Sequence, residues 1–196
     1  MELSQLRKEK AVELTQAIRE GLLELNFLDV QFEMRFYQME QPTANGFDEA
    51  EFMISMNPGE PVRALSDVAS GGELSRIMLA IKTVLAKKDQ VETLIFDEID
   101  VGISGRTAQK VSEKMAVIGK NHQVICITHL AQIAAMADYH YVIEKKVLDG
   151  HTRTGIALLN QDDEIKELAR ILGGAEITET VMQSAKEMKA LAKGTK

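Results

Sequence analysis

The most informative part of the chain is residues 93–105, which read Thr93-Leu94-Ile95-Phe96-Asp97-Glu98-Ile99-Asp100-Val101-Gly102-Ile103-Ser104-Gly105. A short apolar run that ends in two carboxylates is typical of a buried parallel strand whose C-terminal end faces a ligand in α/β proteins. Asp97 could hold a divalent cation through its water shell, and Glu98 could orient or deprotonate a water. Both acids could equally cap a following loop or helix, so the stretch alone leaves two interpretations open.

Composition narrows the class of protein. The chain has 196 residues, 45% of them hydrophobic, so it can bury one sizeable core and carry an extension. Its formal net charge of -7 argues against bulk electrostatic coating of nucleic acid, so DNA contact would need a local basic patch. The single cysteine, Cys126, lies in an apolar run, which predicts a small core residue. No signal core or membrane-length apolar run is present, so we expect a cytoplasmic protein with no membrane partner.

The first sixty residues change their hydrophobic period once. Apolar residues at steps of three and four predict a helix in 1–25, either the end of a coiled-coil arm or an amphipathic helix docked on the domain. Apolar and polar residues then alternate over 30–37 and again over 52–56, which predicts an antiparallel pair around a turn at 42–46. We divide the chain into this helix, a lobe of 26–175, and a C-terminal helix and tail of 176–196.

A second informative stretch, Ser70-Gly71-Gly72-Glu73, precedes apolar residues at helical spacing. It therefore lies at the N-terminus of a helix predicted to end near Lys87. A helix start offers unpaired backbone N–H groups and a partial positive charge, and two glycines let a phosphate approach them closely. The same residues also suit an ordinary serine N-cap, which the stretch alone would favour.

Four motifs in register resemble those of the ATP-binding-cassette (ABC) ATPases. Residues 69–73 resemble the signature motif of that superfamily, 94–98 its Walker B strand, and 100–105 its D-loop. Thr128 and His129 follow the next apolar run, as the switch histidine of the superfamily does. Each motif is weak alone, but their order and spacing agree.

Within this superfamily the sequence is most similar to the RecN family of DNA repair proteins, in the SMC-like branch. The similarity is carried by residues 68–80, 97–105 and 127–134. It implies an α/β fold of a defined kind, the ABC-type, P-loop NTPase-like C-terminal lobe of an ATPase head. The implied lobe has a mainly parallel sheet flanked by helices, a peripheral antiparallel hairpin and an N-terminal helix from a coiled-coil arm.

The resemblance also implies roles for three residues in ATP hydrolysis, with ATP and Mg²⁺ as cofactors. Asp97 would support Mg²⁺, Glu98 would polarise the attacking water, and His129 would contact the γ-phosphate or position the water. Such sites stabilise the charge of the transferring phosphoryl group by positioning rather than by covalent chemistry.

A second set of implied residues acts across a head dimer. Ser70, Gly71, Gly72 and Glu73 belong to the signature that reaches the γ-phosphate of ATP held by the opposing head. Ser104 stands in the D-loop where many relatives have Asp, which leaves its part in communication between heads open.

The implied partners follow from a motif that is missing. The sequence has no Gly-x-x-x-x-Gly-Lys-Ser/Thr, so the chain alone should not hold ATP firmly. The resemblance places that P-loop in an N-terminal lobe of the same protein, with a second head as homodimer partner and DNA bound through the intact protein at the nucleoid. The expected function is ATP hydrolysis in double-strand-break repair and recombination. The alternatives are another chromosome-maintenance or repair ATPase, or a nucleotide-free dimerisation module with the same fold.

The C-terminal part predicts an antiparallel hairpin at the sheet's edge, formed by 139–144 and 155–159, followed by helices at 162–172 and 178–191. Four basic residues there favour a solvated edge, with a small DNA-binding face as the alternative. They are Lys145, Lys146, Arg153 and Lys166.

Overall fold

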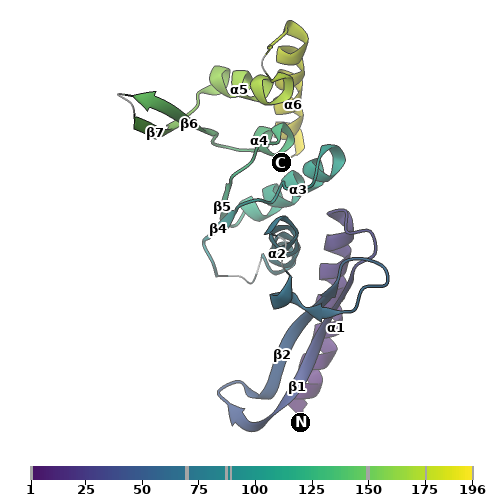
Figure 1. Ribbon diagram of the computed structural model, residues 1–196. Helices are drawn as coiled ribbons and strands as arrows, with labels where there is room; N and C mark the ends of the chain where they lie inside the picture. Colours follow the sequence, from purple (N-terminus) through teal and green to yellow (C-terminus); the bar gives the residue numbers. More distant parts are fainter. Residues whose placement is uncertain are drawn as a thin grey trace.

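The computed structural model describes residues 2–68, 71–86, 88, 90–148, 151–174 and 176–195. Figure 1 shows an elongated molecule that runs from a helix and a long hairpin at one end to a helical module at the other. Its elements are, in order, α1 (Glu2–Glu24), β1 (Gln31–Thr43), β2 (Gly46–Ser55), β3 (Arg63–Ala64), η1 (Leu65–Asp67), α2 (Gly71–Leu85), β4 (Thr93–Phe96), α3 (Gly105–Gly119), β5 (Gln123–Cys126), α4 (Ala131–Ala135), β6 (Tyr141–Leu148), β7 (His151–Leu158), α5 (Gln161–Gly173) and α6 (Glu179–Thr195). None of the helices in these ranges is both long and apolar enough to cross a membrane.

The N-terminal helix lies along the first hairpin. Helix α1 packs on β1 and α2, and its residues Ile18 and Leu22 are buried in the main core. The predicted antiparallel pair of β1 and β2 is confirmed, with Phe32 opposite Ile54. Both strands are longer than predicted, because β1 continues through Pro42 and the pairing register shifts between Gln38 and Thr43. A register irregularity accommodates a proline that cannot donate to the ladder.

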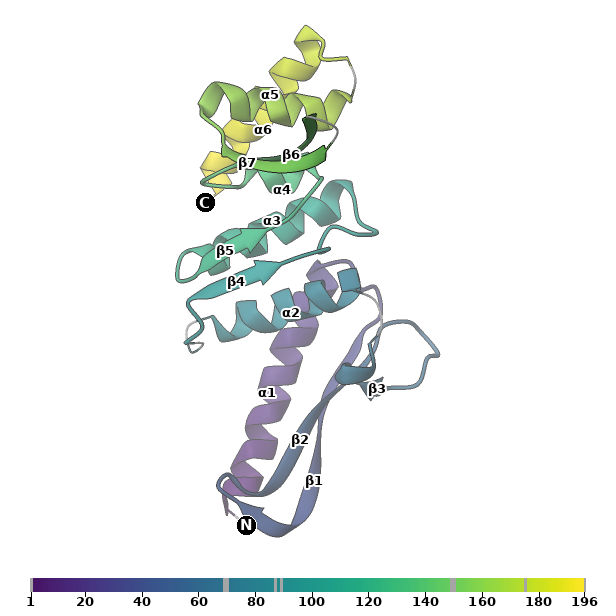
Figure 2. The ribbon, with the colours of Figure 1, turned by 60° about the vertical axis from the view of Figure 1, so that its left-hand side comes forward.

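The predicted parallel sheet is formed by β4 and β5, which pair with Leu94 beside Val124 and Ile95 beside Ile125. Helix α3 connects the two strands, and Figure 2 shows α2 and α3 beside them. Alternate side chains of both strands pack into the main core, whereas Ile95 is 68% exposed. One face of this two-stranded sheet is therefore covered by helices, and the other is open within the described part of the chain.

The single cysteine lies on the covered side. Cys126 packs against the main core, which confirms the prediction of a core residue. Burial raises the pKa of its thiol to about 12, and the nearby carboxylates of Asp100 and Asp97 add to that rise. The thiol therefore stays protonated at neutral pH.

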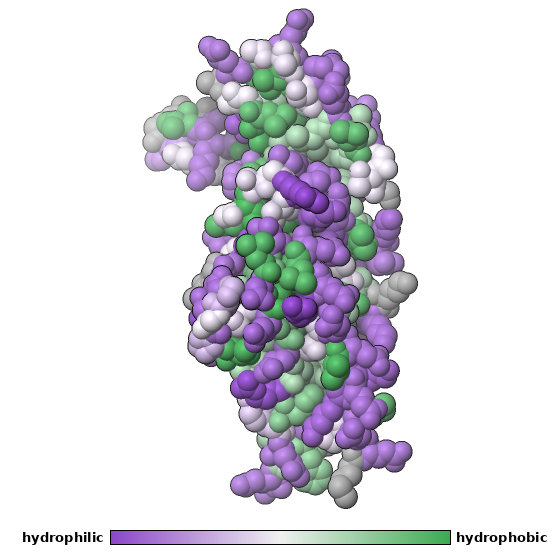
Figure 3. All heavy atoms as spheres, turned by 90° about the vertical axis from the view of Figure 1, so that its right-hand side faces the viewer, coloured by the Kyte–Doolittle hydropathy of each residue, from purple (hydrophilic) through white to green (hydrophobic). Residues whose placement is uncertain are grey.

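The C-terminal elements form a second, smaller core of α4, α5 and α6, which contains Leu168, Ala134 and Ala185. The predicted hairpin is confirmed as β6 and β7, but it forms a separate two-stranded sheet rather than an edge of the β4–β5 sheet. Its predicted tip includes residues 149–150, which lie outside the described residues. Seen from the side in Figure 3, the surface is largely hydrophilic, with separate apolar patches rather than one continuous apolar face.

Candidate functional site

The chain leaves strand β4 through a sharply turned loop. Glu98 has a φ of 57°, a left-handed conformation that is unfavourable for a residue with a side chain. The turn is closed by a hydrogen bond of 2.9 Å from the amide of Glu98 to the Asp97 carboxylate and by one of 3.1 Å from the amide of Val101 to the carbonyl of Glu98. Asp97 and Glu98 remain exposed, while Ile99 and Asp100 turn into the protein. The structure thus presents the two predicted acids at the end of the strand.

The predicted signature helix packs directly against this loop. A Cβ atom on Gly72 would lie 3.0 Å from the carbonyl oxygen of Glu98 and 3.1 Å from the Cβ of Val101, so any larger residue would press on this loop. The Glu98 carboxylate itself lies against Gly71 at the start of α2. The hydroxyl of Ser75 donates a 2.8 Å hydrogen bond to the carbonyl of Asp97. The two motifs, about twenty residues apart in sequence, therefore form one contiguous surface.

A buried arginine, which the sequence reasoning missed, fixes the same contact. Arg76 in α2 donates from Nη1 to the carbonyl of Val101 at 2.9 Å and to that of Ile99 at 3.3 Å. Its guanidinium lies over the ring of Phe27, 5.8 Å from the centroid. Burial lowers its pKa, an effect that the nearby charge of Glu73 opposes. A signal was available, because Arg76 interrupts the apolar positions of an amphipathic helix.

The predicted switch histidine is tied to the same loop through Asp100. The Oδ2 atom of Asp100 accepts hydrogen bonds from the Thr128 hydroxyl at 2.6 Å and from the backbone N–H of His129 at 2.9 Å. The Nδ1 atom of His129 lies 3.0 Å from the same oxygen, with the ring 72% exposed. Asp100 was assigned only to the D-loop from the sequence, because spacing along a chain does not show which carboxylate turns inward.

The other predicted site residues make no hydrogen bond to this network in the described part of the chain. Ser70 lies outside the described residues. Glu73 is half-buried in the first turn of α2. Ser104 precedes α3 in an extended conformation, and its hydroxyl makes no capping hydrogen bond among the described residues. The structure thus brings together Gly71, Gly72, Asp97 and Glu98 and joins His129 to them through Asp100, without placing Ser104 in that network.

A magnesium ion bound beside Asp97 would be coordinated mainly by water and nucleotide phosphates rather than by protein side chains. No group of three or more His, Cys, Asp or Glu residues suited to a metal occurs in the described ranges. Asp97 is exposed and has lone pairs beyond the one that accepts the amide of Glu98. Mg²⁺ usually keeps several waters and binds through one or two carboxylates plus substrate phosphates, so a single strand-end Asp fits it.

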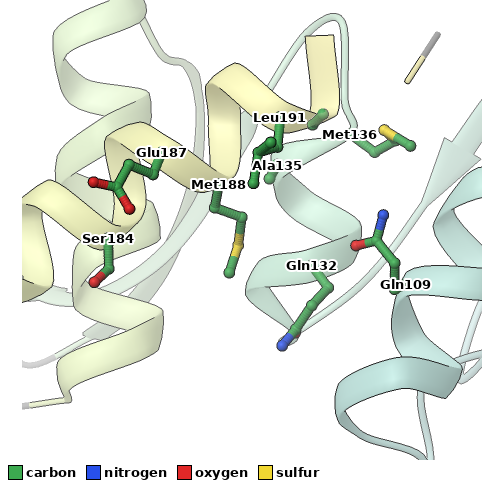
Figure 4. Close-up of a pocket in the computed structure, with 9 residues that line it drawn as sticks. Gln109, Gln132, Ala135, Met136, Ser184, Glu187, Met188 and Leu191 are labelled. Carbon is green, nitrogen blue, oxygen red and sulfur yellow. The ribbon is translucent and has the colours of Figure 1, made fainter. Parts of the chain in front are cut away.

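A cavity of about 330 Å³ lies elsewhere, between α3, α4 and α6. Figure 4 shows the side chains that line it, which come from all three helices. Its lining contains none of the predicted site residues and consists of Gln109, Gln132, Ala135, Met136, Ser184, Glu187, Met188, Leu191 and Ala192. The cavity therefore belongs to the helical module rather than to the loop after β4.

The suggested basic face is not a single face in the structure. Lys146 and Arg153 are register partners in the β6–β7 hairpin, whereas Lys145 pairs with Thr154 one position along and so points to the other side. Lys146 is also paired with Glu144 at 2.6 Å, and Lys166 with Asp163 at 2.8 Å. The four residues therefore do not form one basic face, because strand alternation and local ion pairs divide the charges, and the solvated edge that the sequence favours fits them better.

Sequence similarity to known proteins identifies the family of the chain. The chain is 44% identical over 198 residues to the DNA repair protein RecN of Halalkalibacterium halodurans, covering 99% of this chain and 35% of that protein. It is 41% identical over 201 residues to the DNA repair protein RecN of Bacillus subtilis, covering 95% and 35%. The chain belongs to the RecN family. The chain spans 35% of the length of each of these relatives.

Solved structures support the fold of the chain. An Smc head domain with a coiled coil and joint from Pyrococcus yayanosii matches with a TM-score of 0.57 at 21% identity, over 83% of this chain and 29% of that one. No family model matches the chain. These matches confirm the predicted α/β fold of the lobe.

Proposed function

We propose that this chain is the C-terminal half of an SMC-like ATPase head that hydrolyses ATP between two engaged heads in DNA double-strand-break repair and recombination, at the bacterial nucleoid in the cytoplasm. The single observation that carries the proposal is the meeting of the α2 start, the Asp97–Glu98 loop and, through Asp100, the Thr128–His129 loop on one surface. Membership of the RecN family supports it independently.

In this proposal three side chains act on the nucleotide bound by the same head. Asp97 holds Mg²⁺ through water, Glu98 polarises the attacking water, and His129 contacts the γ-phosphate or positions that water. The exposure of all three is what a site that receives its ligand from outside the chain requires. Bound Mg²⁺ would neutralise part of the phosphate charge.

The start of α2 acts on the nucleotide of the opposing head. Ser70, Gly71, Gly72 and Glu73 would approach its γ-phosphate with backbone N–H groups of the helix start. A carboxylate, that of Glu98, already lies against Gly71, which supports the helix start as a place for negative charge. Hydrolysis then needs two heads, because each supplies what the other lacks. Ser104 would lie in the D-loop between them.

The open face of the β4–β5 sheet is the proposed contact with an N-terminal P-loop lobe of the same protein. Ile95 and Ile125 are neighbours in register, and Ile127 follows on the same face. Their side chains are 68%, 44% and 50% exposed, so three adjacent isoleucines lie uncovered within the described part. Parallel sheets are normally covered on both faces. The relatives are about three times as long as the matched region, which is enough chain for such a lobe.

The test is ATP hydrolysis by this chain alone, by an N-terminal lobe alone, and by their mixture. We expect activity in the mixture only, and its loss with Glu98→Gln. Glu92→Gln is the matched control, because Glu92 is exposed just before the opposite end of the same strand.

A mixture that associates but hydrolyses no ATP would favour the nucleotide-free dimerisation module. Activity that survives Glu98→Gln would remove Glu98 from the chemical step and leave the ATPase assignment in place.

A further inference from the structure

Asp100 is a buried carboxylate whose side-chain partners, among the described residues, all lie in the Thr128–His129 loop. It is 3% exposed, and one oxygen, Oδ2, meets the Thr128 hydroxyl, the His129 amide and the His129 ring. A buried carboxylate is costly unless donors satisfy it, so these contacts hold the loop in one conformation. The Thr128 hydroxyl in turn accepts the amide of Leu130 at 3.0 Å, which continues the network into the start of α4.

The ring contact has a chemical consequence that the other two contacts lack. An ionised carboxylate carries only lone pairs, so a ring nitrogen held 3.0 Å from it is repelled unless that nitrogen carries a proton. At 3.0 Å from Asp100, this nitrogen of His129 is Nδ1. The other nitrogen, Nε2, lies on the far side of a ring that is 72% exposed. In neutral imidazole the two nitrogens have opposite roles, so fixing one fixes the other.

We propose that Asp100 is a positioning residue for ATP hydrolysis. It holds His129 by a hydrogen bond from the backbone N–H and by its 3.0 Å approach to Nδ1, and so presents Nε2 outward to the nucleotide. The inference rests on the proposed function, in which His129 faces the γ-phosphate or the attacking water. Asp100 itself touches neither, because it is buried behind the loop. Its contribution resembles that of carboxylates that orient functional histidines elsewhere by accepting the second ring N–H.

The decisive measurement is the protonation state of the two ring nitrogens of His129 in ¹⁵N-labelled chain, by long-range ¹H–¹⁵N NMR at about pH 8, where imidazole is ordinarily neutral. We expect Nδ1 protonated and Nε2 unprotonated in the wild type. Asp100→Ala should lose this preference, and Asp100→Asn should retain it in part, because an amide oxygen still accepts. A wild-type ring protonated at Nε2 would overturn the inference without any variant.

Thr128→Val separates tautomer control from simple support of the loop. It removes one donor to the same oxygen but leaves the ring contact intact, so the Nδ1–H tautomer should persist. If Asp100 only supported the loop, Thr128→Val and Asp100→Ala would change the ring spectrum alike. Circular dichroism establishes that each variant is folded, and if Asp100→Ala is not, the wild-type and Asp100→Asn spectra decide.

Kinetics in the two-lobe mixture complete the test. Asp100→Ala should lower kcat by roughly tenfold to a hundredfold, with little change in KM for ATP, since the loss of an orienting partner costs about that much. An unchanged kcat would overturn the positioning role. An inactive wild-type mixture would instead count against the proposed function, while the NMR result would still decide whether Asp100 fixes His129.

Discussion

The two hydrophobic cores of this molecule differ in where their charged side chains lie. The main core is built of large aliphatic side chains such as Ile77 and Leu79. The buried charges of Arg76 and Asp100 hold the loop at its edge, where the acids Asp97 and Glu98 are exposed. The second core is lined mainly by alanines, which let helices approach closely, and an ion pair and a histidine lie within it. Charge that is exposed at a strand end is available to a ligand, whereas charge satisfied inside a helical module is structural. This difference separates the proposed active surface from the rest of the head.

The largest expected effect comes from breaking the ion pair of the second core. Lys189 lies 3.2 Å from Glu164, with side chains 9% and 10% exposed, and it also donates to the carbonyl of Ala137 at 2.9 Å. Lys189→Met should lower the free energy of unfolding by about 3–5 kcal/mol, because it leaves a buried carboxylate unpaired. Urea denaturation measures this.

Two further variants sharpen the result for the ion pair. Lys186→Met, at an exposed position of the same helix, should change stability by less than about 0.5 kcal/mol. Adding Glu164→Gln to Lys189→Met should recover part of the loss, since it removes the unpaired charge. Equal stability of Lys189→Met and wild type would show that the second core does not depend on its internal charge pair.

Beside the main core the corresponding test is to replace each of two neighbouring glycines by alanine. Gly72→Ala should destabilise the fold by about 1–3 kcal/mol, because the new Cβ would press on the backbone of Glu98 and on Val101. Gly71→Ala should cost less, since its Cβ meets only the end of the flexible Glu98 side chain. Thermal unfolding of the two variants side by side measures the difference, and a larger loss for Gly71→Ala would contradict this packing.

The sequence predicted those features whose local structure depends only on neighbouring residues. The apolar run before Asp97, the glycines before a helical pattern and the alternation in β1 and β2 each give a local structure from a local period. These patterns were enough to predict the parallel pair, the helix start and the first hairpin.

Contacts between segments far apart in sequence could not be predicted in the same way. Nothing local indicates that Asp100, rather than Asp97, turns inward to Thr128, because this depends on the left-handed backbone of Glu98. The same holds for Arg76, whose acceptors are carbonyls of a loop more than twenty residues away. The basic residues of the hairpin were grouped by composition, but strand alternation assigns Lys145 and Lys146 to opposite faces.

A smaller effect on the second core should follow from pH. Burial lowers the pKa of His140, against the opposing charges of Glu164 and Glu167 and with the help of Lys189, and its Nδ1 is buried without a partner among the described residues. The neutral ring thus favours the folded state above about pH 6.5, and this contribution is lost as pH falls through the lowered pKa.

The matching experiment compares unfolding at about pH 7 and about pH 5. His140→Gln should lose less stability than the wild type over this interval, because its side chain does not titrate there. His151→Gln, at an exposed position in β7, should behave as the wild type does. If His140→Gln keeps the full acid sensitivity, the pH dependence of the second core arises from its carboxylates instead.

The smallest change concerns reactivity in the main core rather than stability. With its pKa raised to about 12 by burial and by the charges of Asp100 and Asp97, Cys126 forms almost no thiolate in the folded protein at pH 8. An unfolded chain, with a thiol pKa of about 8.5, should react with iodoacetamide on the order of a thousandfold faster. Ser184→Cys in a Cys126→Ser background supplies an exposed thiol on α6 as the reference in the second core. If alkylation of the folded wild-type chain instead rises with pH at a midpoint of about 8.5, the ordinary thiol pKa, Cys126 is exposed to water. The face of the β4–β5 sheet that carries Cys126 would then not be covered, and the packing behind the proposed active surface would be wrong.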